Sequence, residues 1–346
     1  MKRVLVTGAN GHIGANTVRS LMKRNYQVVP MVRKGADLRG IEKLGIDYVY
    51  GDILNYDAVV SAVRGCDVVI HHASVYKMWV QDRNEILQPA IDGTENIFKA
   101  ANETGVERIV YTSSMAAIGF ANHPDQLRTP NDWNQDPHSN YYYAKTISER
   151  IAVELSEKFG IPTIRLCPTL VLGPLDYRLT PSTKSLLDLI NGTQTTYEGG
   201  LNYVHVFDVA EAHAQAIEKG EPGSRFIVGG ENVHLKQVAT LIYEITGHKP
   251  VHLGVTGPIA ELTGAILGGI SRITNKPPLY DRAVVQDMVG RYGYFDCSNT
   301  NEVFSLRPQG AEEVVQNTVR WLLFLGLIKP SSAKGITMPM APDKDW

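Results

Sequence analysis

The chain has 346 residues, of which 43% are hydrophobic and 20% charged, and its formal net charge is -2 at pH 7. This is the composition of a globular protein with enough residues to bury a core. A balanced charge without a Lys/Arg cluster argues against a nucleic-acid partner. Cys66, Cys167 and Cys297 are widely spaced. They predict reduced thiols in a cytoplasmic protein rather than disulfides or a zinc site.

Two stretches of the sequence are candidates for membrane contact, the first residues and residues 253–273. Residues 1–8 run directly into a strand and its turn, and their apolar run is too short for a signal peptide. The most membrane-like stretch, residues 253–273, is interrupted by Pro258, Glu261 and Arg272. We therefore expect no membrane span. Two interpretations stay open for this stretch: helix packing, and contact with lipid or with an apolar substrate.

Strand and helix signals alternate through the amino-terminal half. Short apolar runs predict strands, and apolar residues at helical spacing predict helices. Because helices separate the strands, the strands should pair in parallel, with both faces of the sheet covered. The expected strands are residues 4–6, 27–32, 48–50, 68–70, 108–112 and 163–166, and the expected helices are residues 14–24, 56–63, 93–104 and 141–159.

The alternation becomes less regular after Gly173-Pro174, and the carboxy-terminal part is expected to be mostly helical. The whole pattern predicts an α/β protein, a Rossmann-type doubly wound parallel sheet of about seven strands with a smaller, mainly helical substrate lobe. Later elements are expected at residues 182–191, 209–219, 225–228 and 312–325. The expected domains are residues 1–174 with 203–228 for the Rossmann part, residues 175–202 with 229–330 for the lobe, and residues 331–346 for a loose tail.

A glycine-rich loop lies between the first strand and the first helix. Gly8, Gly11 and Gly14 form a GxxGxxG pattern. Glycine is needed where the turn is tight, where the backbone approaches a phosphate, and where the helix packs against the sheet. The free amides at the start of the helix can then bind the diphosphate of a dinucleotide. The loop residues expected to bind the cofactor are Gly8, Asn10, Gly11, His12 and Ile13.

The end of the second strand indicates which dinucleotide is bound. An acid there would accept hydrogen bonds from a ribose diol. This chain has Arg33 and Lys34 instead, with no acid until Asp37. Two cations suit the 2′-phosphate of NADP. The alternative is a solvated loop. The sequence therefore predicts NADP(H) as the preferred cofactor, with NAD(H) still possible.

Two further loops are expected beside the cofactor. Asp52 and Ile53 follow the third strand, where Asp52 could meet the adenine amino group. His71 and His72 follow the fourth strand; because adjacent residues of an extended chain point to opposite faces, they do not predict a metal site. His72, Ala73 and Ser74 are expected beside the cofactor.

A tyrosine and a lysine at helical spacing predict acid–base chemistry. Tyr141 lies four residues before Lys145, which places both side chains on one helix face. The ammonium should lower the pKa of the phenol and bind the nicotinamide ribose. Tyr142 and Tyr143 are expected to be packing aromatics. Either serine of Thr112-Ser113-Ser114 could polarise a substrate oxygen.

These motifs resemble the extended short-chain dehydrogenase/reductase superfamily, or NAD-dependent epimerase/dehydratase superfamily, over nearly the whole chain. The chain is most similar to its dihydroflavonol-reductase-like branch, which includes hopanoid-associated sugar epimerases. Further matching segments are residues 51–53, 74–79, 93–94, 168–174 and 204–210. The resemblance implies that Ser114 is the catalytic serine and that helices 93–104 and 141–159 form a homodimer. It also implies that Thr112, Pro168, Thr169 and Leu170 lie at the cofactor.

Departures from the family patterns narrow the reaction. Sugar-nucleotide dehydratases have an acidic pair where this chain has Met115-Ala116, so elimination lacks its acid and base. Nucleotide-sugar epimerases commonly have an arginine at the position of Leu201 to bind diphosphate. Flavonoid reductases have an asparagine at the position of Gly119. These differences argue against a dehydratase, a nucleotide sugar and a flavonoid substrate.

The sequence therefore predicts an NADPH-dependent oxidoreductase that reduces a ketone or aldehyde on a largely apolar small molecule, or catalyses the reverse oxidation. Tyr141 would protonate the oxygen, Ser114 would polarise it, and Lys145 would tune the phenol. One alternative is an epimerase or isomerase of a nucleotide sugar or steroid-like alcohol with tightly bound NAD(P). Another is a non-catalytic cofactor sensor, which would not need the trio. The substrate residues expected by analogy are Tyr76, Met78, Trp79, Ser114, Met115 and Tyr177, with residues 253–267 as a further apolar wall.

Overall fold

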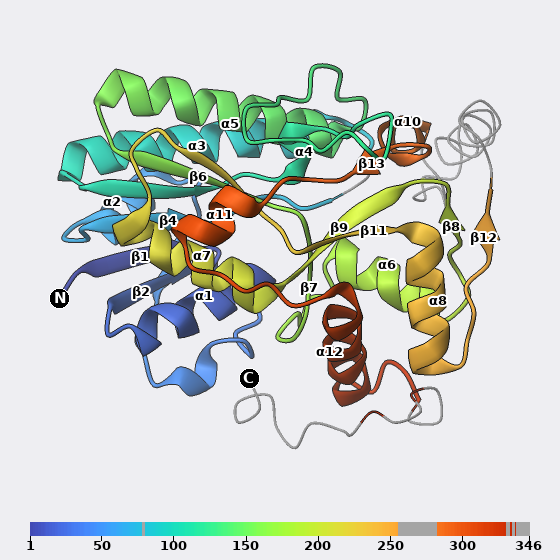
Figure 1. Ribbon diagram of the computed structural model, residues 1–346. Helices are drawn as coiled ribbons and strands as arrows, with labels where there is room; N and C mark the ends of the chain where they lie inside the picture. Colours follow the sequence, from blue (N-terminus) through green and yellow to red (C-terminus); the bar gives the residue numbers. More distant parts are fainter. Residues whose placement is uncertain (78–79, 255–281, 330–332, 334–335, 337–346) are drawn as a thin grey trace.

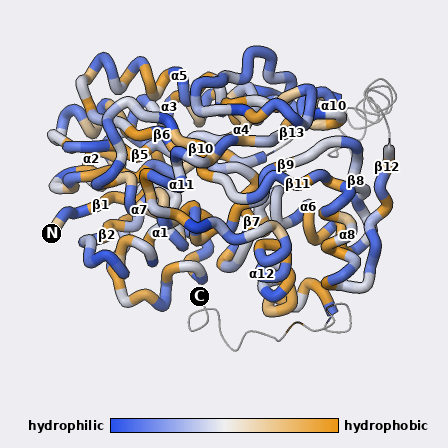
Figure 2. Tube along the Cα trace, in the orientation of Figure 1, coloured by the Kyte–Doolittle hydropathy of each residue, from blue (hydrophilic) through white to orange (hydrophobic). Residues whose placement is uncertain are grey.

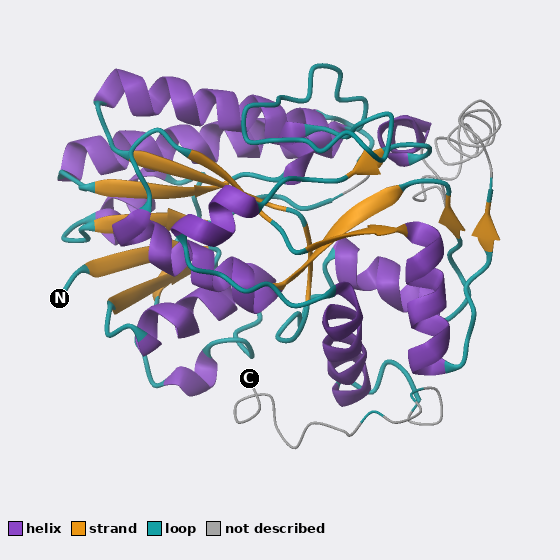
Figure 3. Cartoon of the chain, viewed as in Figure 1, coloured by secondary structure: helices purple, strands orange, loops and turns teal. Residues whose placement is uncertain are grey.

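The computed structural model describes residues 1–77, 80–254, 282–329, 333 and 336. Its centre is a seven-stranded sheet with helices on both faces (Figures 1 and 3). The strands are β1 (Arg3–Thr7), β2 (Gln27–Val32), β3 (Val49–Tyr50), β4 (Val68–His71), β5 (Arg108–Thr112), β6 (Thr163–Pro168) and β10 (Arg225–Val228). They lie in the order β10-β6-β5-β4-β1-β2-β3, and every neighbouring pair is parallel. The predicted doubly wound parallel sheet is confirmed.

Successive strand residues bury opposite faces of this sheet. In β1, Val4 and Val6 join one apolar cluster, and Leu5 joins another. Helices α1 (His12–Lys23) and α7 (Val206–Lys219) cover the first face, and α2 (Tyr56–Val63), α3 (Asn84–Thr104) and α5 (Asn140–Phe159) cover the second. Apolar stretches therefore run through the strands, while the helices mix apolar and hydrophilic residues (Figure 2). The three cysteines are buried free thiols.

Helix α3 is longer than predicted. It begins at Asn84 rather than at residue 93, and it contains Pro89. Gly93 therefore lies inside the helix, where an added Cβ would collide with the side chain of Ile53. The absence of a side chain at Gly93 lets α3 pack closely on the segment that follows β3.

The smaller lobe combines helices with a second sheet. Its helices are α6 (Pro181–Ile190), α8 (Leu235–Thr246), α10 (Arg282–Met288) and α12 (Ala311–Phe324). The second sheet contains β7 (Leu170–Leu172), β9 (Gly200–His205), β11 (Glu231–His234) and β13 (Tyr292–Gly293), beside a short pair of β8 (Thr196–Tyr197) and β12 (His252–Leu253). The helices fit the expected lobe, but the sequence patterns did not predict this sheet. Three short elements, η1 (Glu42–Leu44), α4 (Met115–Ile118) and α11 (Ser298–Val303), complete the described helices.

The topology determines where a ligand can bind. The chain turns in opposite directions after β1 and β4, which are neighbours in the sheet. A crevice forms at such a point, outside the carboxyl ends of the strands. The loops that follow β1, β4, β5 and β6 meet at this edge, opposite the smaller lobe (Figure 1).

Candidate active site

A cavity of about 420 Å³ lies between the carboxyl edge of the large sheet and the smaller lobe. The sheet side consists of the glycine loop, the segments after β4 and β5, and the first turn of α5. Segments of α6, β9 and α10 form the opposite wall. The predicted site residues that line the cavity are Gly8, Gly11, His12, Ile13, His72, Ser74, Tyr76, Thr112, Ser114, Met115, Tyr141, Lys145, Pro168, Thr169 and Leu170. The structure thus brings the glycine loop and the Ser-Tyr-Lys trio to one cavity.

The glycine loop has the shape that a diphosphate requires. Gly8 has a φ of +65°, and a Cβ there would lie 3.0 Å from the backbone N of Ala73. A Cβ on Gly14 would collide with the carbonyl oxygen of Gly8. Gly11 precedes α1 without a side-chain cap, so the first amides of this helix lack side-chain acceptors there. These residues would hold a dinucleotide diphosphate, with the open amides and the helix dipole facing its charge.

The loop after β2 is attached to the glycine loop. The Asn10 Nδ2 donates to the carbonyl oxygen of Asp37 at 3.1 Å. The Asp37 carboxylate accepts from Arg39 Nε at 3.0 Å, and this contact lowers the pKa of Asp37. Arg33 and Lys34 are exposed immediately after β2. The first acid after this strand is therefore neutralised by Arg39, while the two preceding cations face solvent.

Six of the predicted cofactor residues lie outside the lining of the cavity, namely Asn10, Arg33 and Lys34, described above, and Asp52, Ile53 and Ala73. Asp52 accepts from the backbone N of Leu54 at 3.0 Å, and the carbonyl of Ile53 accepts from Asn96 at 2.8 Å. The backbone N of Ala73 donates to the Thr7 hydroxyl at 3.1 Å. Asp52 and Ile53 follow the edge strand β3, and Ala73 lies beneath Gly8. These contacts shape the loops around the glycine turn.

The adjacent histidines have separate partners. His71 Nδ1 lies 2.8 Å from the Thr7 hydroxyl, whereas His72 Nδ1 lies 2.8 Å from the Thr112 hydroxyl. Thr112 also lies 2.9 Å from His213 Nε2, and His213 Nδ1 lies 2.7 Å from the carbonyl of Val209. Because His213 must donate to that carbonyl, its Nε2 accepts from Thr112, which in turn accepts from His72. Burial lowers the pKa of both strand histidines, so they are neutral.

The structure separates the roles of the two serines. The Ser113 hydroxyl donates to Glu149 Oε2 at 2.5 Å and is buried. Ser114 caps the short helix α4, accepting from the backbone N of Ala116 at 3.2 Å, and its hydroxyl acts on the Tyr141 phenol to lower the pKa of that phenol. The Ser113 hydroxyl is committed to Glu149, so the geometry supports Ser114 as the group that faces a substrate oxygen beside Tyr141.

The pKa of Tyr141 differs from the prediction that Lys145 would lower it. Burial raises the pKa of the phenol; Tyr76 raises it further, and the Ser114 hydrogen bond opposes this. Lys145 is not among the described groups that shift it. The Lys145 ammonium donates to the carbonyl of Thr112 at 3.4 Å, and burial lowers its own pKa to about 8. The phenol therefore stays protonated, as a proton donor must be.

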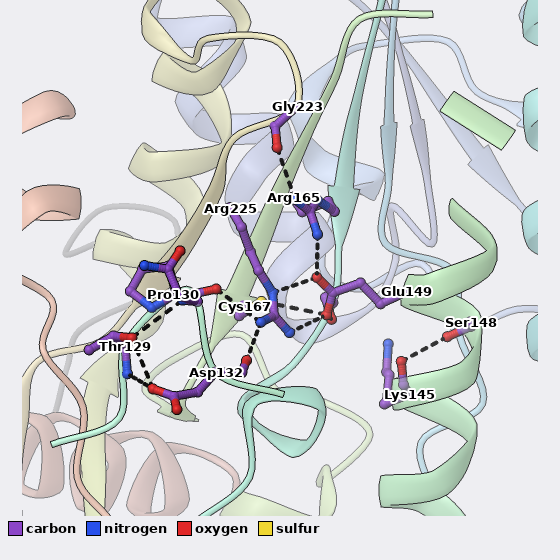
Figure 4. Close-up of polar contacts among 12 residues, drawn as sticks. Thr129, Pro130, Asp132, Lys145, Ser148, Glu149, Arg165, Cys167, Gly223 and Arg225 are labelled. Carbon is purple, nitrogen blue, oxygen red and sulfur yellow. Dashed lines mark hydrogen bonds and ion pairs between the residues drawn. The ribbon is translucent and has the colours of Figure 1, made fainter. Parts of the chain in front are cut away.

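A buried charge cluster surrounds Glu149, on the same helix as Lys145 (Figure 4). Glu149 is fully buried one helical turn after Lys145. Its carboxylate accepts from Arg225 at 2.6 and 2.8 Å and from Arg165 at 3.3 Å, in addition to the Ser113 bond. Arg225 also donates to the carbonyl of Pro130, in the loop that precedes α5. Sequence reasoning missed this cluster, which links β5, β6, β10 and α5.

The predicted substrate residues differ in where the structure places them, and further residues join the cavity wall. Tyr76 lies 4.8 Å from the Tyr141 ring, and its hydroxyl lies 3.1 Å from Ser182. Tyr177 is instead outside the lining, because its ring packs edge-on against Trp321 at 4.8 Å. Met78, Trp79 and most of the 253–273 segment lie outside the described residues. Further lining residues include Tyr142, Leu186, Leu189, Tyr197, Leu201, Tyr203, Val285 and Met288.

The comparison with family models decides the family. Residues 4–229 match the NAD dependent epimerase/dehydratase family. The chain belongs to this family. It is 30% identical to a protein of Synechocystis named as a dihydroflavonol 4-reductase, over 94% of this chain and 95% of that protein. It is 27% identical to Sterol demethylase protein B of Methylococcus capsulatus, over 94% and 99%, and 32% identical to Cinnamoyl-CoA reductase CAD2 of Medicago truncatula, over 70% and 80%.

Solved structures of the epimerase/dehydratase family share the whole architecture. The structure of gox2253 has a TM-score of 0.83 at 28% identity, covering 95% of this chain and all (100%) of that one. The yeast methylglyoxal/isovaleraldehyde reductase Gre2, complexed with NADPH, has a TM-score of 0.72 at 22% identity, covering 94% and 100%. The UDP-glucose 4-epimerase of Thermus thermophilus, complexed with NAD, has a TM-score of 0.72 at 23% identity, covering 93% and 99%. At these identities, the last two show the fold alone.

Family membership establishes the general chemistry. The protein is an NAD(P)-dependent enzyme of the extended short-chain dehydrogenase/reductase type, which acts on C=O or CH–OH groups of small molecules. Within the described ranges, no helix has both the length and the apolar character needed to cross a membrane.

Proposed function

We propose that this enzyme uses NADPH to reduce a ketone or aldehyde on a largely apolar small molecule. The observation that supports this most strongly is the Ser114-Tyr141-Lys145 trio on a mainly apolar cavity. Among the described residues that line the cavity, none other than Lys145 is a lysine, arginine, aspartate or glutamate. The diphosphate of a nucleotide-sugar substrate would need a further cation in the cavity. The position where such an arginine would stand is Leu201, which lines the cavity.

The side chains have distinct roles in this reduction. Bound NADPH would supply the hydride to the carbonyl carbon. Ser114 donates a hydrogen bond to the carbonyl oxygen and polarises the C=O bond. Tyr141, protonated because of its raised pKa, transfers its proton to that oxygen and completes the alcohol. The Lys145 ammonium would bind a hydroxyl of the nicotinamide ribose and hold the cofactor beside Tyr141.

A carbonyl panel tests this proposal. NADPH and NADH consumption would be followed with 2-decanone, cinnamaldehyde and a 3-ketosteroid, and epimerisation with UDP-glucose. We expect net NADPH consumption with the neutral apolar carbonyls. A purified protein that holds oxidised cofactor tightly, consumes no NADPH and epimerises UDP-glucose would favour the alternative epimerase and refute the reductase. The homodimer implied by the family resemblance stays a prediction, which light scattering would measure.

Removing the two cations after β2 should change the cofactor preference. Arg33 and Lys34 are exposed where a 2′-phosphate would lie, and Asp37 is already paired with Arg39. In the double variant Arg33→Ala/Lys34→Ala, the Kd for NADPH should rise at least ~10-fold, the loss of about one charge-assisted hydrogen bond. The Kd for NADH should stay unchanged. Fluorescence titration measures both constants, with Lys23→Ala as an exposed-lysine control. Equal weakening of both cofactors would contradict the assignment.

The rate of reduction should fall as the pH rises through about 8. Burial lowers the Lys145 pKa to that value, so the ammonium is present below it and is lost above it. Without that charge, the nicotinamide ribose is held less firmly beside Tyr141. The pH dependence of kcat measures the effect. In Lys145→Arg, whose guanidinium does not titrate in this range, the fall should disappear. A fall at the same pH in this variant would show that another group titrates.

A further inference from the structure

The position of Tyr141 in its helix makes it depend on the helix cap. Tyr141 is the second residue of α5, and Ser139 is the N-cap. The carbonyl of Ser139 accepts from the backbone N of Tyr143 at 3.0 Å, but the amides that precede Tyr143 have no intrahelical acceptors and depend on capping contacts. The Ser139 hydroxyl accepts from the backbone N of Tyr142 at 3.4 Å, which is a long bond. A second contact at this helix end would add to the stability of the turn that carries the phenol.

That contact comes from the opposite wall of the cavity. Asp287, on α10, is 8% exposed. Its Oδ1 accepts from the backbone N of His138 at 3.0 Å, and its Oδ2 accepts from the backbone N of Ser139 at 2.9 Å. The ring nitrogen His138 Nδ1 lies 3.1 Å from the same Oδ1. Helix α10 lies beside the loop that precedes α5 (Figure 1). We call these three contacts the Asp287 clasp.

The clasp joins a substrate-facing surface to the catalytic helix. Val285 and Met288 flank Asp287 on α10, and both line the cavity. A carboxylate at a helix N-terminus is also favoured by the helix dipole. Without it, the backbone amide of the buried Ser139 would lose its acceptor. An apolar group packed on Val285 and Met288 would therefore fix α10, and through Asp287 the first turn of α5.

We propose that Asp287 is a positioning residue of the reaction, which rests on the reductase proposed above. When the apolar part of the substrate binds at a distance from the carbonyl, Asp287 fixes the position of Tyr141. Binding energy used in this way raises kcat rather than lowering KM, because it is realised in the geometry of the transition state. Longer apolar substrates should therefore react faster, and the clasp should be required for that gain.

A series of methyl ketones from 2-butanone to 2-decanone, at saturating NADPH, tests this. In the wild type, kcat should rise about 10-fold along the series, the scale of a modest orientation effect. In Asp287→Asn, this rise should disappear, while KM still falls with chain length and the Kd for NADPH is unchanged. Asp136→Asn is the matched control. Asp136 lies 3.5 Å from His138 Nε2 and leaves both backbone bonds of the clasp intact.

Hydrogen exchange provides a readout that needs no turnover. In the NADPH-bound protein, the amides of residues 138–143 should exchange about 10-fold faster in Asp287→Asn than in the wild type, because the first turn opens more often. Val285→Ala should flatten the chain-length effect without changing this exchange. Unchanged exchange and an unchanged kcat series in Asp287→Asn would overturn the clasp. Full turnover by Tyr141→Phe would instead overturn the reductase mechanism, whatever the exchange shows.

Discussion

Replacing Tyr141 with phenylalanine is expected to lower kcat by about 10²- to 10⁴-fold, the usual contribution of a positioned proton donor. The phenol lies beside Ser114 on the cavity, and its raised pKa keeps the proton available. Phenylalanine retains the ring contact with Tyr76 at 4.8 Å but cannot donate a proton. The Kd for NADPH should stay within about two-fold of the wild type, because the phenol hydroxyl acts on the substrate in the transition state and is not needed to bind the cofactor. Steady-state rates and cofactor titration measure the two effects.

The neighbouring tyrosines supply the control. Tyr143 is on the same helix, and its ring packs under Arg83 at 4.4 Å rather than lining the cavity. Tyr143→Phe removes the same atom and should retain wild-type turnover. If Tyr141→Phe kept more than about a tenth of the wild-type kcat, another acid would have to protonate the substrate, and the assignment would fail.

The large sheet was predictable because its signals are local. Each strand is a short apolar run, and the helices between strands leave parallel pairing as the natural solution. The glycine loop and the Tyr141-Lys145 pair were predictable for the same reason, since a turn and one helical turn are fixed by adjacent residues. The structure brings these motifs together at the carboxyl edge of the sheet.

The second sheet and the electrostatics depend on contacts between distant residues. Strand β9 pairs with β7, β11 and β13, which are far apart in the chain, so no local pattern indicates the pairing. The prediction that Lys145 lowers the pKa of Tyr141 depended on the spacing of the two residues alone. Burial, which opposes the charged form of both groups, dominates in the folded protein. Burial depends on the lobe that covers the site, so spacing cannot indicate it.

The choice between the two serines also depends on a contact between residues far apart in the chain. In the sequence, Ser113 and Ser114 are equivalent hydroxyls. The structure distinguishes them through Glu149, which is 36 residues after Ser113 and accepts its hydrogen bond. A glutamate in an amphipathic helix is normally exposed. Only the folded arrangement of α5 against β6 and β10 shows that this one is buried, because its two arginine partners come from those strands.

Replacing Glu149 with glutamine should destabilise the fold more than other single polar changes in α5. Its carboxylate faces Arg225 and Arg165 in a buried site, so glutamine would leave two guanidinium groups without a countercharge. Breaking a buried pair from one side costs about 3–5 kcal/mol. The free energy of unfolding, measured by urea denaturation, should fall by that amount. Glu154→Gln changes an exposed glutamate of the same helix and should have almost no effect.

A double-mutant cycle separates the ion pair from general damage to the helix. Arg225 binds Glu149 through two nitrogens, and its bonds to the carbonyls of Pro130 and Asp132 anchor the loop before α5. Arg225→Gln should therefore also destabilise the protein, but the double variant should lose less than the sum of the two single variants, because both remove one shared interaction. Glu149→Gln would weaken the hydrogen bond from Ser113, and Arg225→Gln would loosen the loop before α5. Turnover should therefore fall in both single variants, though less than in Tyr141→Phe. Strictly additive losses would show that Glu149 and Arg225 act separately, and that this charge cluster is not the unit that joins β10 to the catalytic helix.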